Sequence, residues 1–337
     1  MRMLVFGGTR FLSRAVAVEA LARGHEVLCA ARGESGPVPD GATFVRVDRD
    51  APAGLRPLRD AVRSGQRFDA VLDTATMSLR WVCDALDALG AVTGHWTFVS
   101  TINVYADTQT PGQTVDAPLV EPVFDAATER SPEIYGGVKV ASENAVRSTG
   151  VPAFVIRAGL LVGPGDTEDR FGYWAARMAR GGQVLVPGDA DEVPASWIDV
   201  RDLAAWMVDS AQQGRTGTFD GSGPAMPLRD VLAELASALA PVGTELVAVP
   251  APVLREAGVV PWSGPRSLPL WVPPTHYGLV SHDVDASRHA GLRQRPLAET
   301  AAAALAHEHV LGVDRPRQAG LTSDEEAELL SAWQAGR

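Results

Sequence analysis

The sequence predicts an α/β protein with a doubly wound parallel sheet and a smaller C-terminal α/β lobe. Three observations predict it. Short apolar runs alternate with helical patterns through the first half of the chain, and such alternation requires crossover connections between parallel strands. The first apolar run leads directly into Gly7 and Gly8. After Gly163-Pro164-Gly165 the alternation gives way to helices mixed with short strands and prolines.

Six apolar runs in the first half predict the strands of this sheet. They are bounded by turn residues and cover residues 3–6, 26–31, 43–47, 69–73, 96–100 and 153–157. Apolar residues at helical spacing predict helices at residues 11–23, 54–64, 79–89 and 133–148. Helices between parallel strands cover the sheet on both faces, so its strands should be buried.

The second half predicts a separate lobe. Helical patterns lie at residues 171–180, 200–212 and 228–239. We expect residues 1–160 to form the sheet domain together with a returning segment at about residues 198–225. Residues 161–197 and 226–337 should form the smaller lobe.

Two stretches of this lobe have distinctive patterns. Residues 249–274 hold seven prolines with Trp262 and Trp271, so we expect no regular element there. Such a loop is either a lid or pocket wall over a site, or a plain surface excursion. Ser323 and Glu326 have the spacing of a capping box and predict the start of a last helix.

Composition excludes several classes of function. A chain of 337 residues with 46% apolar residues is long enough for one large or two modest domains. The net charge of −11 argues against binding to nucleic acid or to anionic membranes. Cys29 and Cys83 offer no disulfide framework, and we find no signal peptide or membrane span, so we expect a cytoplasmic protein. We expect no metal site, because His307 and His309 would point in different directions on a helix.

The first loop has the sequence of an anion-binding turn. Strand and helix are joined by Gly7-Gly8-Thr9-Arg10-Phe11-Leu12-Ser13. Parallel sheets bind ligands at the carboxyl ends of their strands, and a helix N-terminus there offers free N–H groups to a pyrophosphate. Read as G-x-x-G-x-x-G, the loop keeps only Gly7, so the pattern is weak without its position between strand and helix.

The end of the second strand favours NADP(H) over NAD(H). The run Ala30-Ala31-Arg32-Gly33 has no acid for ribose hydroxyls. Arg32 suits a 2′-phosphate, and Arg10 could reach the same region from the first loop. Asp48, after the third strand, is a candidate acceptor for the adenine amino group. Thr74 and Ala75, after the fourth strand, are further expected cofactor contacts.

Lys139 is the only lysine among thirty lysines and arginines, and it follows Tyr135 by four residues. A compact ammonium on a flexible stem differs from the wide planar guanidinium that the chain uses elsewhere. Residues four apart share a helix face, so the ammonium can lie beside the phenol. A nearby positive charge lowers a phenol pKa, and we therefore expect a lowered pKa for Tyr135.

Together these pieces resemble the extended short-chain dehydrogenase/reductases, also called the NAD-dependent epimerase/dehydratase family. The likeness covers about residues 1–225 in order and implies a Rossmann-type fold. Its motifs are Gly7 to Leu12, Ser100-Thr101-Ile102-Asn103-Val104-Tyr105, Tyr135-x-x-x-Lys139, Arg157 to Pro164, and Trp197 to Asp202. The resemblance implies that Tyr135 is the general acid/base, Lys139 its electrostatic partner and ribose anchor, and Thr101 the hydroxyl that orients the substrate oxygen.

Departures from the family pattern bear on the substrate. Ser13 replaces a glycine of the phosphate loop and could contact a phosphate. Ile102-Asn103 stands where sugar-nucleotide dehydratases carry Asp-Glu, which argues against a dehydratase. Residues 158–160 lack the Asn usual in nucleotide-sugar epimerases, so the substrate need not be a nucleotide sugar. Six side chains could line an apolar substrate pocket, although ordinary packing is the favoured interpretation for each one singly: Tyr173, Trp174, Trp262, Trp271, His276 and Tyr277.

Three functional hypotheses remain. The first is an NADP(H)-dependent oxidoreductase that interconverts a carbonyl and an alcohol on a small molecule. The second is an epimerase, of a nucleotide sugar or another sugar, that keeps NAD(P) bound and returns the hydride to the same substrate. The third is a catalytically silent dinucleotide-binding protein. The resemblance also implies a homodimer through the helices at about residues 79–89 and 133–148.

Overall fold

The computed structural model describes residues 1–75, 78–124 and 131–336. Its centre is a seven-stranded sheet in the order β11-β6-β5-β4-β1-β2-β3, with every neighbouring pair parallel. The strands are β1 Arg2–Phe6, β2 Glu26–Ala31, β3 Thr43–Arg46, β4 Ala70–Asp73, β5 Trp96–Thr101, β6 Ala153–Ala158 and β11 Gly217–Gly221. The predicted fold class is confirmed, and the returning strand β11 completes the sheet beside β6.

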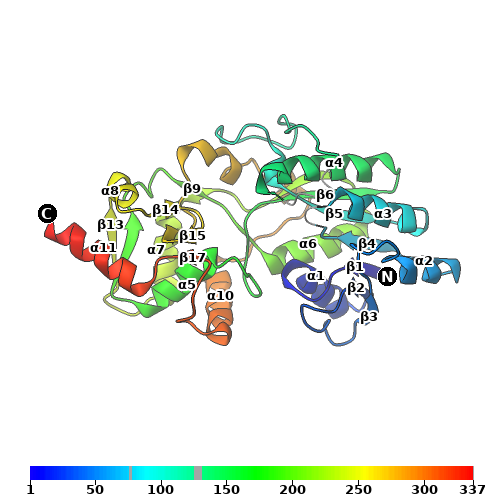
Figure 1. Cartoon of the computed structure of the whole chain (residues 1–337), viewed down its shortest axis with the longest axis horizontal. Helices are drawn as coiled ribbons and strands as arrows, with labels where there is room; N and C mark the ends of the chain where they lie inside the picture. The colour runs from blue at the N-terminus through cyan, green and yellow to red at the C-terminus, as the bar shows by residue number, and fades with distance from the viewer. Residues whose placement is uncertain (76–77, 125–130, 337) are drawn as a thin grey trace.

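The two faces of the sheet bury alternate residues of its inner strands, whereas the edge strand β3 is mostly exposed. From β1, Met3 and Val5 pack against α1 (Phe11–Ala22) and α6 (Val200–Gln213). Leu4 and Phe6 pack on the opposite face with α2 (Arg56–Arg63), α3 (Leu79–Leu89) and α4 (Tyr135–Ser148). Side chains alternate along a strand, so a continuous apolar run implies helices on both sides. Figure 1 shows these two helical layers around the sheet.

The second lobe lies beside the first and contains the C-terminus, whereas the N-terminus lies in the sheet domain (Figure 1). Its core centres on two buried tryptophans, Trp174 and Trp271. Its helices are α5 Arg170–Arg180, α7 Leu228–Leu239, α8 Ala251–Glu256, α10 Leu297–Leu311 and α11 Ser323–Ala335. The short helix α9 Asp285–His289 lies against β11 of the sheet domain, where Ser287 Oγ donates to the Asp220 carbonyl at 2.7 Å. Strand β8 Gln183–Pro187 pairs with β13 Glu245–Val249.

Short elements connect these parts. The two-residue strands are β7 Leu161–Val162, β9 Pro194–Ala195, β10 Ile198–Asp199, β12 Met226–Pro227, β14 Val260–Pro261, β15 Gly264–Pro265, β16 Ser267–Leu268 and β17 Ala319–Gly320. Single 3-10 turns are η1 Gly90–Val92, η2 Ile102–Val104, η3 Pro132–Ile134, η4 Pro274–His276 and η5 Gly278–Val280. Within the described part of the chain, no helix is long and apolar enough to cross a membrane.

The expectation of an irregular stretch at residues 249–274 is wrong. Helix α8 starts there with Pro252 in its first turn, where a missing N–H costs nothing, and three short strands follow. Trp262 and Arg266 take positive φ angles of 72° and 51° between these strands, and Leu270 takes one of 67° after the last of them. Trp271 is only 1% exposed and donates to Asp189 Oδ1 at 3.0 Å, so it is part of the lobe core.

The capping box of the last helix is shifted by one residue from its predicted position. Thr322 and Glu325 form it, rather than Ser323 and Glu326. Both pairs have the required spacing, so the sequence alone could not choose between them. Glu326 is instead buried, where its carboxylate accepts from Arg177 Nε at 2.5 Å and Leu185 N at 2.9 Å. That contact ties the last helix to the core of the lobe.

Candidate active site

The first loop is shaped by glycines that a side chain could not replace. Gly7 and Gly8 have φ angles of 108° and 92°. A Cβ on Gly7 would lie 2.6 Å from Ser13 Oγ, and one on Gly8 would overlap the Cys29 side chain. Ser13 Oγ donates to the Arg10 carbonyl at 2.8 Å, so this hydroxyl stabilises the loop from within. This hydrogen bond accounts for a serine at position 13 without the phosphate contact that we expected.

The N-terminus of α1 fits an anion. Arg10, the N-cap residue, has extended backbone and makes no side-chain hydrogen bond to the first turn. The N–H groups of that turn therefore lack the side-chain acceptor that usually satisfies them. With the tight glycine turn before it, this helix end offers the cradle that a dinucleotide pyrophosphate requires.

Lys139 lies under the carboxyl ends of β4 and β5. It is 2% exposed, and its ammonium donates to the carbonyl oxygens of Val99, at 2.6 Å, and Ala75. The ammonium also lies 4.9 Å from the centre of the Phe98 ring. Burial lowers the pKa of Lys139 to about 8. The negative charges of Asp73 and Glu143 favour the protonated form and offset only part of this shift.

Thr101 and Tyr135 meet at this point. Thr101 ends β5, and its Oγ1 accepts from Asn103 N at 3.2 Å and Asn103 Nδ2 at 3.0 Å. Burial raises the pKa of the Tyr135 phenol, and a side-chain hydrogen bond with Thr101 only partly offsets it. The expected lowering by Lys139 is wrong: its ammonium binds backbone carbonyls and lies 5.9 Å from the Tyr135 ring centre.

Two buried ion pairs, which the sequence did not predict, flank Lys139. Asp73 accepts from Arg49 at 2.8 and 3.1 Å and from Ala75 N at 2.9 Å. Glu143, one helical turn beyond Lys139, accepts from Arg157 at 3.0 and 3.1 Å. Two features of the sequence could have indicated these pairs: Asp73 ends an apolar strand, and Glu143 follows Lys139 by four residues. Asp73 fixes the turn whose carbonyl binds the ammonium.

A buried polar chain continues from Arg157. Its Nη1 donates to Tyr105 Oη at 3.2 Å, and Tyr105 donates to Asp220 Oδ1 at 2.6 Å. His282 stacks on Tyr105 with ring centres 4.2 Å apart. This series of hydrogen bonds links β6, β11 and the segment after Thr101, so it stabilises the elements that carry the site.

The remaining cofactor candidates lie around the carboxyl edge of the sheet. Thr74 Oγ1 donates to the Phe6 carbonyl at 3.1 Å, and Asp48 Oδ1 accepts from Asp50 N at 3.0 Å. Leu12 is buried, whereas Thr9 and Phe11 line a cavity. Arg32 is exposed and lies 3.5 Å from Glu34.

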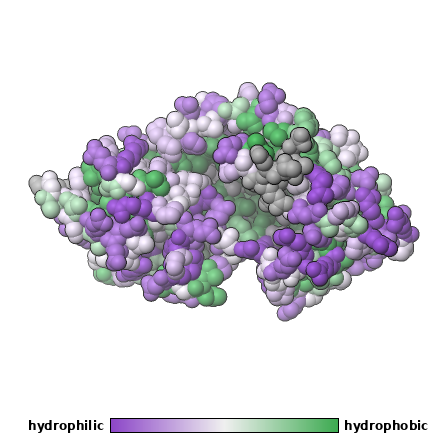
Figure 2. All heavy atoms as spheres, in the orientation of Figure 1, coloured by the Kyte–Doolittle hydropathy of each residue, from purple (hydrophilic) through white to green (hydrophobic). Residues whose placement is uncertain are grey.

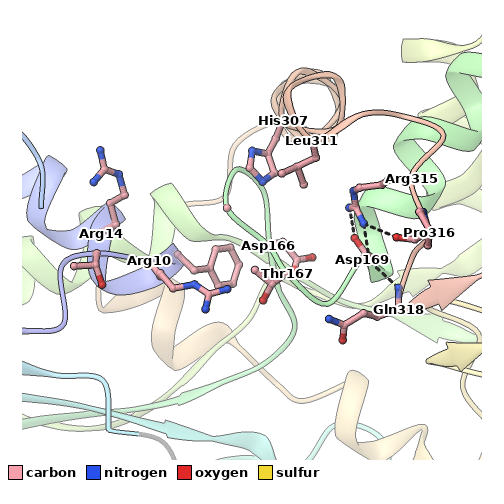
Figure 3. Close-up of a pocket in the computed structure, with 13 residues that line it drawn as sticks. Arg10, Arg14, Asp166, Thr167, Asp169, His307, Leu311, Arg315, Pro316 and Gln318 are labelled. Carbon is pink, nitrogen blue, oxygen red and sulfur yellow. Dashed lines mark hydrogen bonds and ion pairs between the residues drawn. The ribbon is translucent and has the colours of Figure 1, made fainter. Parts of the chain in front are cut away.

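Arg10 faces a cavity of about 440 Å³ between the first loop, residues 165–169 and residues 307–318. Figure 3 shows its side chain extending toward Asp166 and Thr167. Figure 2 shows the surface hollowed between the two lobes. Arg32 does not line this cavity, and its place beside Arg10 at a 2′-phosphate stays a prediction.

The aromatic pocket proved to be mainly core. Tyr173, Trp174 and Trp271 are at most 3% exposed and belong to the hydrophobic core of the lobe. Trp262 lies beneath the Arg170 guanidinium at 4.7 Å. His276 is exposed and Tyr277 half-buried. Among the described residues, no group of three or more side chains could hold a metal ion.

The fold and the site define a class of protein. A parallel Rossmann-type sheet, an uncapped helix after a glycine turn, and a Tyr-Lys pair beside a strand-end Thr are the features of an extended short-chain dehydrogenase/reductase. The model of the NAD dependent epimerase/dehydratase family matches residues 3–219, so the chain belongs to that family. It is therefore an enzyme of a family that uses a nicotinamide dinucleotide.

Solved structures share the fold at low identity. The Bordetella bronchiseptica enzyme WbmH, in complex with NAD⁺, is 17% identical with a TM-score of 0.65, over 92% of this chain and 99% of that one. The Thermus thermophilus UDP-glucose 4-epimerase is 20% identical with a TM-score of 0.59, over 92% and 99%. The Bacillus cereus UDP-glucuronic acid 4-epimerase is 15% identical with a TM-score of 0.65, over 92% and 100%. No curated protein sequence matches this chain.

Proposed function

We propose that this protein interconverts a carbonyl and an alcohol on a small-molecule substrate, with NADP(H) as the cofactor. The observation that carries the proposal is the position of Lys139. It is a buried ammonium one helical turn from Tyr135, held by carbonyls at the ends of the two strands beside the site. A structural lysine would rarely be buried with so low a pKa, whereas strongly perturbed groups cluster at functional sites.

The residues present suit a dinucleotide. The loop from Gly7 to Leu12 would hold the pyrophosphate, Asp48 the adenine, and Tyr135 with Lys139 the nicotinamide ribose. Thr74 and Ala75 would border the cofactor at the end of β4. When bound, the nicotinamide supplies or accepts the hydride.

The chain's own side chains would move the proton. The raised pKa of Tyr135 keeps its phenol protonated near neutral pH, which suits proton donation to a carbonyl oxygen as it is reduced. Thr101 would orient that oxygen through Tyr135, with whose phenol its hydroxyl shares a hydrogen bond. Replacing Tyr135 by Phe removes the proton and should abolish turnover while dinucleotide binding persists.

NADP(H) remains the proposed cofactor on the evidence of β2. The strand ends in Ala30 and Ala31 without an acid, and Arg32 is exposed at its exit. The similar structures of Bordetella and Bacillus proteins contain NAD, which makes NAD(H) the alternative. Thermal unfolding with each cofactor separates the two: greater stabilisation by NADH would refute the preference.

A sugar epimerase is the second candidate, because the family and the epimerases of similar fold favour it. Such an enzyme returns the hydride to its substrate, so it consumes no cofactor. Net oxidation of NADPH during turnover would identify a reductase, and substrate conversion without it would identify an epimerase. A catalytically silent binding protein is the third candidate and would bind dinucleotide without any turnover.

We also propose a homodimer, on the resemblance alone. Residues 136–143 of α4 are already buried within the protomer, so an interface there would have to use the exposed residues of α3 and the end of α4. A solution mass measurement decides between monomer and dimer.

A further inference from the structure

We infer that Asn103 is a positioning residue that turns the Thr101 hydroxyl into a fixed donor toward Tyr135. The inference deepens the proposed function and rests on it, because it assigns Thr101 and Tyr135 to the reacting oxygen. Asn103 would act through Thr101 rather than on the substrate.

The argument begins with the hydrogen-bonding capacity of a hydroxyl. Thr101 Oγ1 has one O–H to donate and two lone pairs to accept with. Asn103 supplies two donors to it, the backbone N–H at 3.2 Å and the side-chain Nδ2–H at 3.0 Å. Both lone pairs are then occupied, and the O–H is the capacity that remains. Thr101 can therefore donate to Tyr135 but not accept from it.

The direction of that bond matters for Tyr135. A donated hydrogen bond stabilises the phenolate, so it eases loss of the phenol proton. The O–H of Tyr135 must then find an acceptor other than Thr101. A substrate carbonyl oxygen would supply one: the Tyr135 O–H bond would break as the product O–H bond formed, and a reduced nicotinamide, when bound, would supply the hydride to the substrate carbon.

Backbone packing fixes Asn103 relative to Tyr135. The Asn103 carbonyl lies so close to Gly136 that a Cβ there would overlap it. Gly136 directly follows Tyr135 at the start of α4. The turn that carries Asn103 and the helix that carries Tyr135 thus meet at a glycine, which fixes the backbone of Asn103 relative to Tyr135.

The side chain at position 103 must be an amide. The variant Asn103→Asp keeps the shape but loses the side-chain N–H, so its carboxylate would accept the Thr101 O–H and draw it away from Tyr135. The residue at position 103 would therefore decide whether Thr101 serves Tyr135 or a neighbouring acid.

The test is a phenol titration of the full chain with bound NADPH, in protein containing carbon-labelled tyrosine. The chain has only four tyrosines, and Tyr135→Phe assigns the relevant resonance. Asn103 is exposed, so Asn103→Ala should leave the melting temperature unchanged. We expect Asn103→Ala to raise the Tyr135 pKa, Asn103→Asp to raise it further, and kcat to fall about tenfold with little change in KM.

A double-mutant cycle separates positioning from a direct effect. In a Thr101→Val background, Asn103→Ala should no longer shift the Tyr135 pKa. An unshifted pKa in the single variant Asn103→Ala, or a shift that persists in the Thr101→Val background, would overturn the inference. Full turnover by Tyr135→Phe would instead refute the proposed function, while the titration would still decide the role of Asn103.

Discussion

At the scale of single residues, the burial of Lys139 predicts how the free energy of unfolding depends on pH. Its pKa falls from 10.5 to about 8 on folding, because burial disfavours the charged form. Below about pH 8 both states are protonated, and the cost of the buried charge is fully present. Between about pH 8 and 10.5 the unfolded chain binds more protons, so stability rises with pH.

We expect this rise to contribute about 3 kcal/mol to the free energy of unfolding. Lys139→Met should abolish that contribution, which is read from the difference between the two proteins in urea unfolding across this pH range. Parallel pH curves for wild type and variant would show that the lysine is not charged and buried as described.

A second residue-scale prediction concerns the kind of cation. Lys139→Arg places a wider group between the Phe98 ring and two carbonyls. We expect it to fold, to lose about 1–3 kcal/mol of stability by overpacking, and to lose activity about a hundredfold or more. Exposed Arg67→Lys is the control and should behave as wild type. Full activity of Lys139→Arg would contradict the role assigned to the ammonium.

Single residues also mark the limits of sequence reasoning. Lys139 stood out because it is a lone lysine, and Thr101 because of its spacing from Tyr105. The predicted direction of the Tyr135 pKa shift was wrong. That direction depends on how deeply the phenol is buried and on where the Lys139 ammonium points. The bonds of Asn103 to Thr101 depend on a rotamer, which no spacing encodes.

At the scale of elements, the start of α4 makes the next prediction. Gly136→Ala would push a Cβ into the Asn103 carbonyl. We expect a loss of about 1–3 kcal/mol from overpacking, with a fall in turnover as the Thr101 turn is displaced. Helical Gly90 has only Val151 nearby, at 3.6 Å, so Gly90→Ala should be neutral or stabilising. Chemical denaturation and turnover measure both, and equal stability of the two variants would contradict the close approach.

Element boundaries were predicted well where apolar runs alternate and less well where caps and prolines decide. All six predicted strands exist, because each is an apolar run bounded by turn residues, although β3 at the edge of the sheet is mostly exposed. Helix α8 was missed, because the density of prolines suggested that no helix could form. The capping box lay one residue away, because tertiary contacts recruit Glu326 into the core.

At the scale of the whole molecule, cofactor choice depends on the edge of the sheet domain. We expect NADPH to raise the melting temperature more than NADH does, because Arg32 would pair with a 2′-phosphate. Arg32→Ala should weaken NADPH binding about tenfold, because it removes one charge-assisted hydrogen bond to the 2′-phosphate. It should leave NADH binding unchanged. Arg67→Ala is the matched control. Equal loss for both cofactors would mean that Arg32 does not read the phosphate.

The arrangement of the two lobes could be foreseen only in outline. The change in pattern near Gly165 marked the second lobe, but not the cavity that it forms with the first loop. Arg10 and Asp166 approach that cavity from opposite lobes, 156 positions apart in sequence order (166 minus 10), and only the fold brings them together.

The central claim is that Tyr135 passes a proton beside a nicotinamide. The most direct measurement is single-turnover oxidation of enzyme-bound NADPH by a panel of carbonyl compounds, followed by nicotinamide absorbance. For any compound that reacts, we predict that Tyr135→Phe slows this step at least about a hundredfold while NADPH binds as tightly as to wild type. An unchanged rate in Tyr135→Phe would contradict the account.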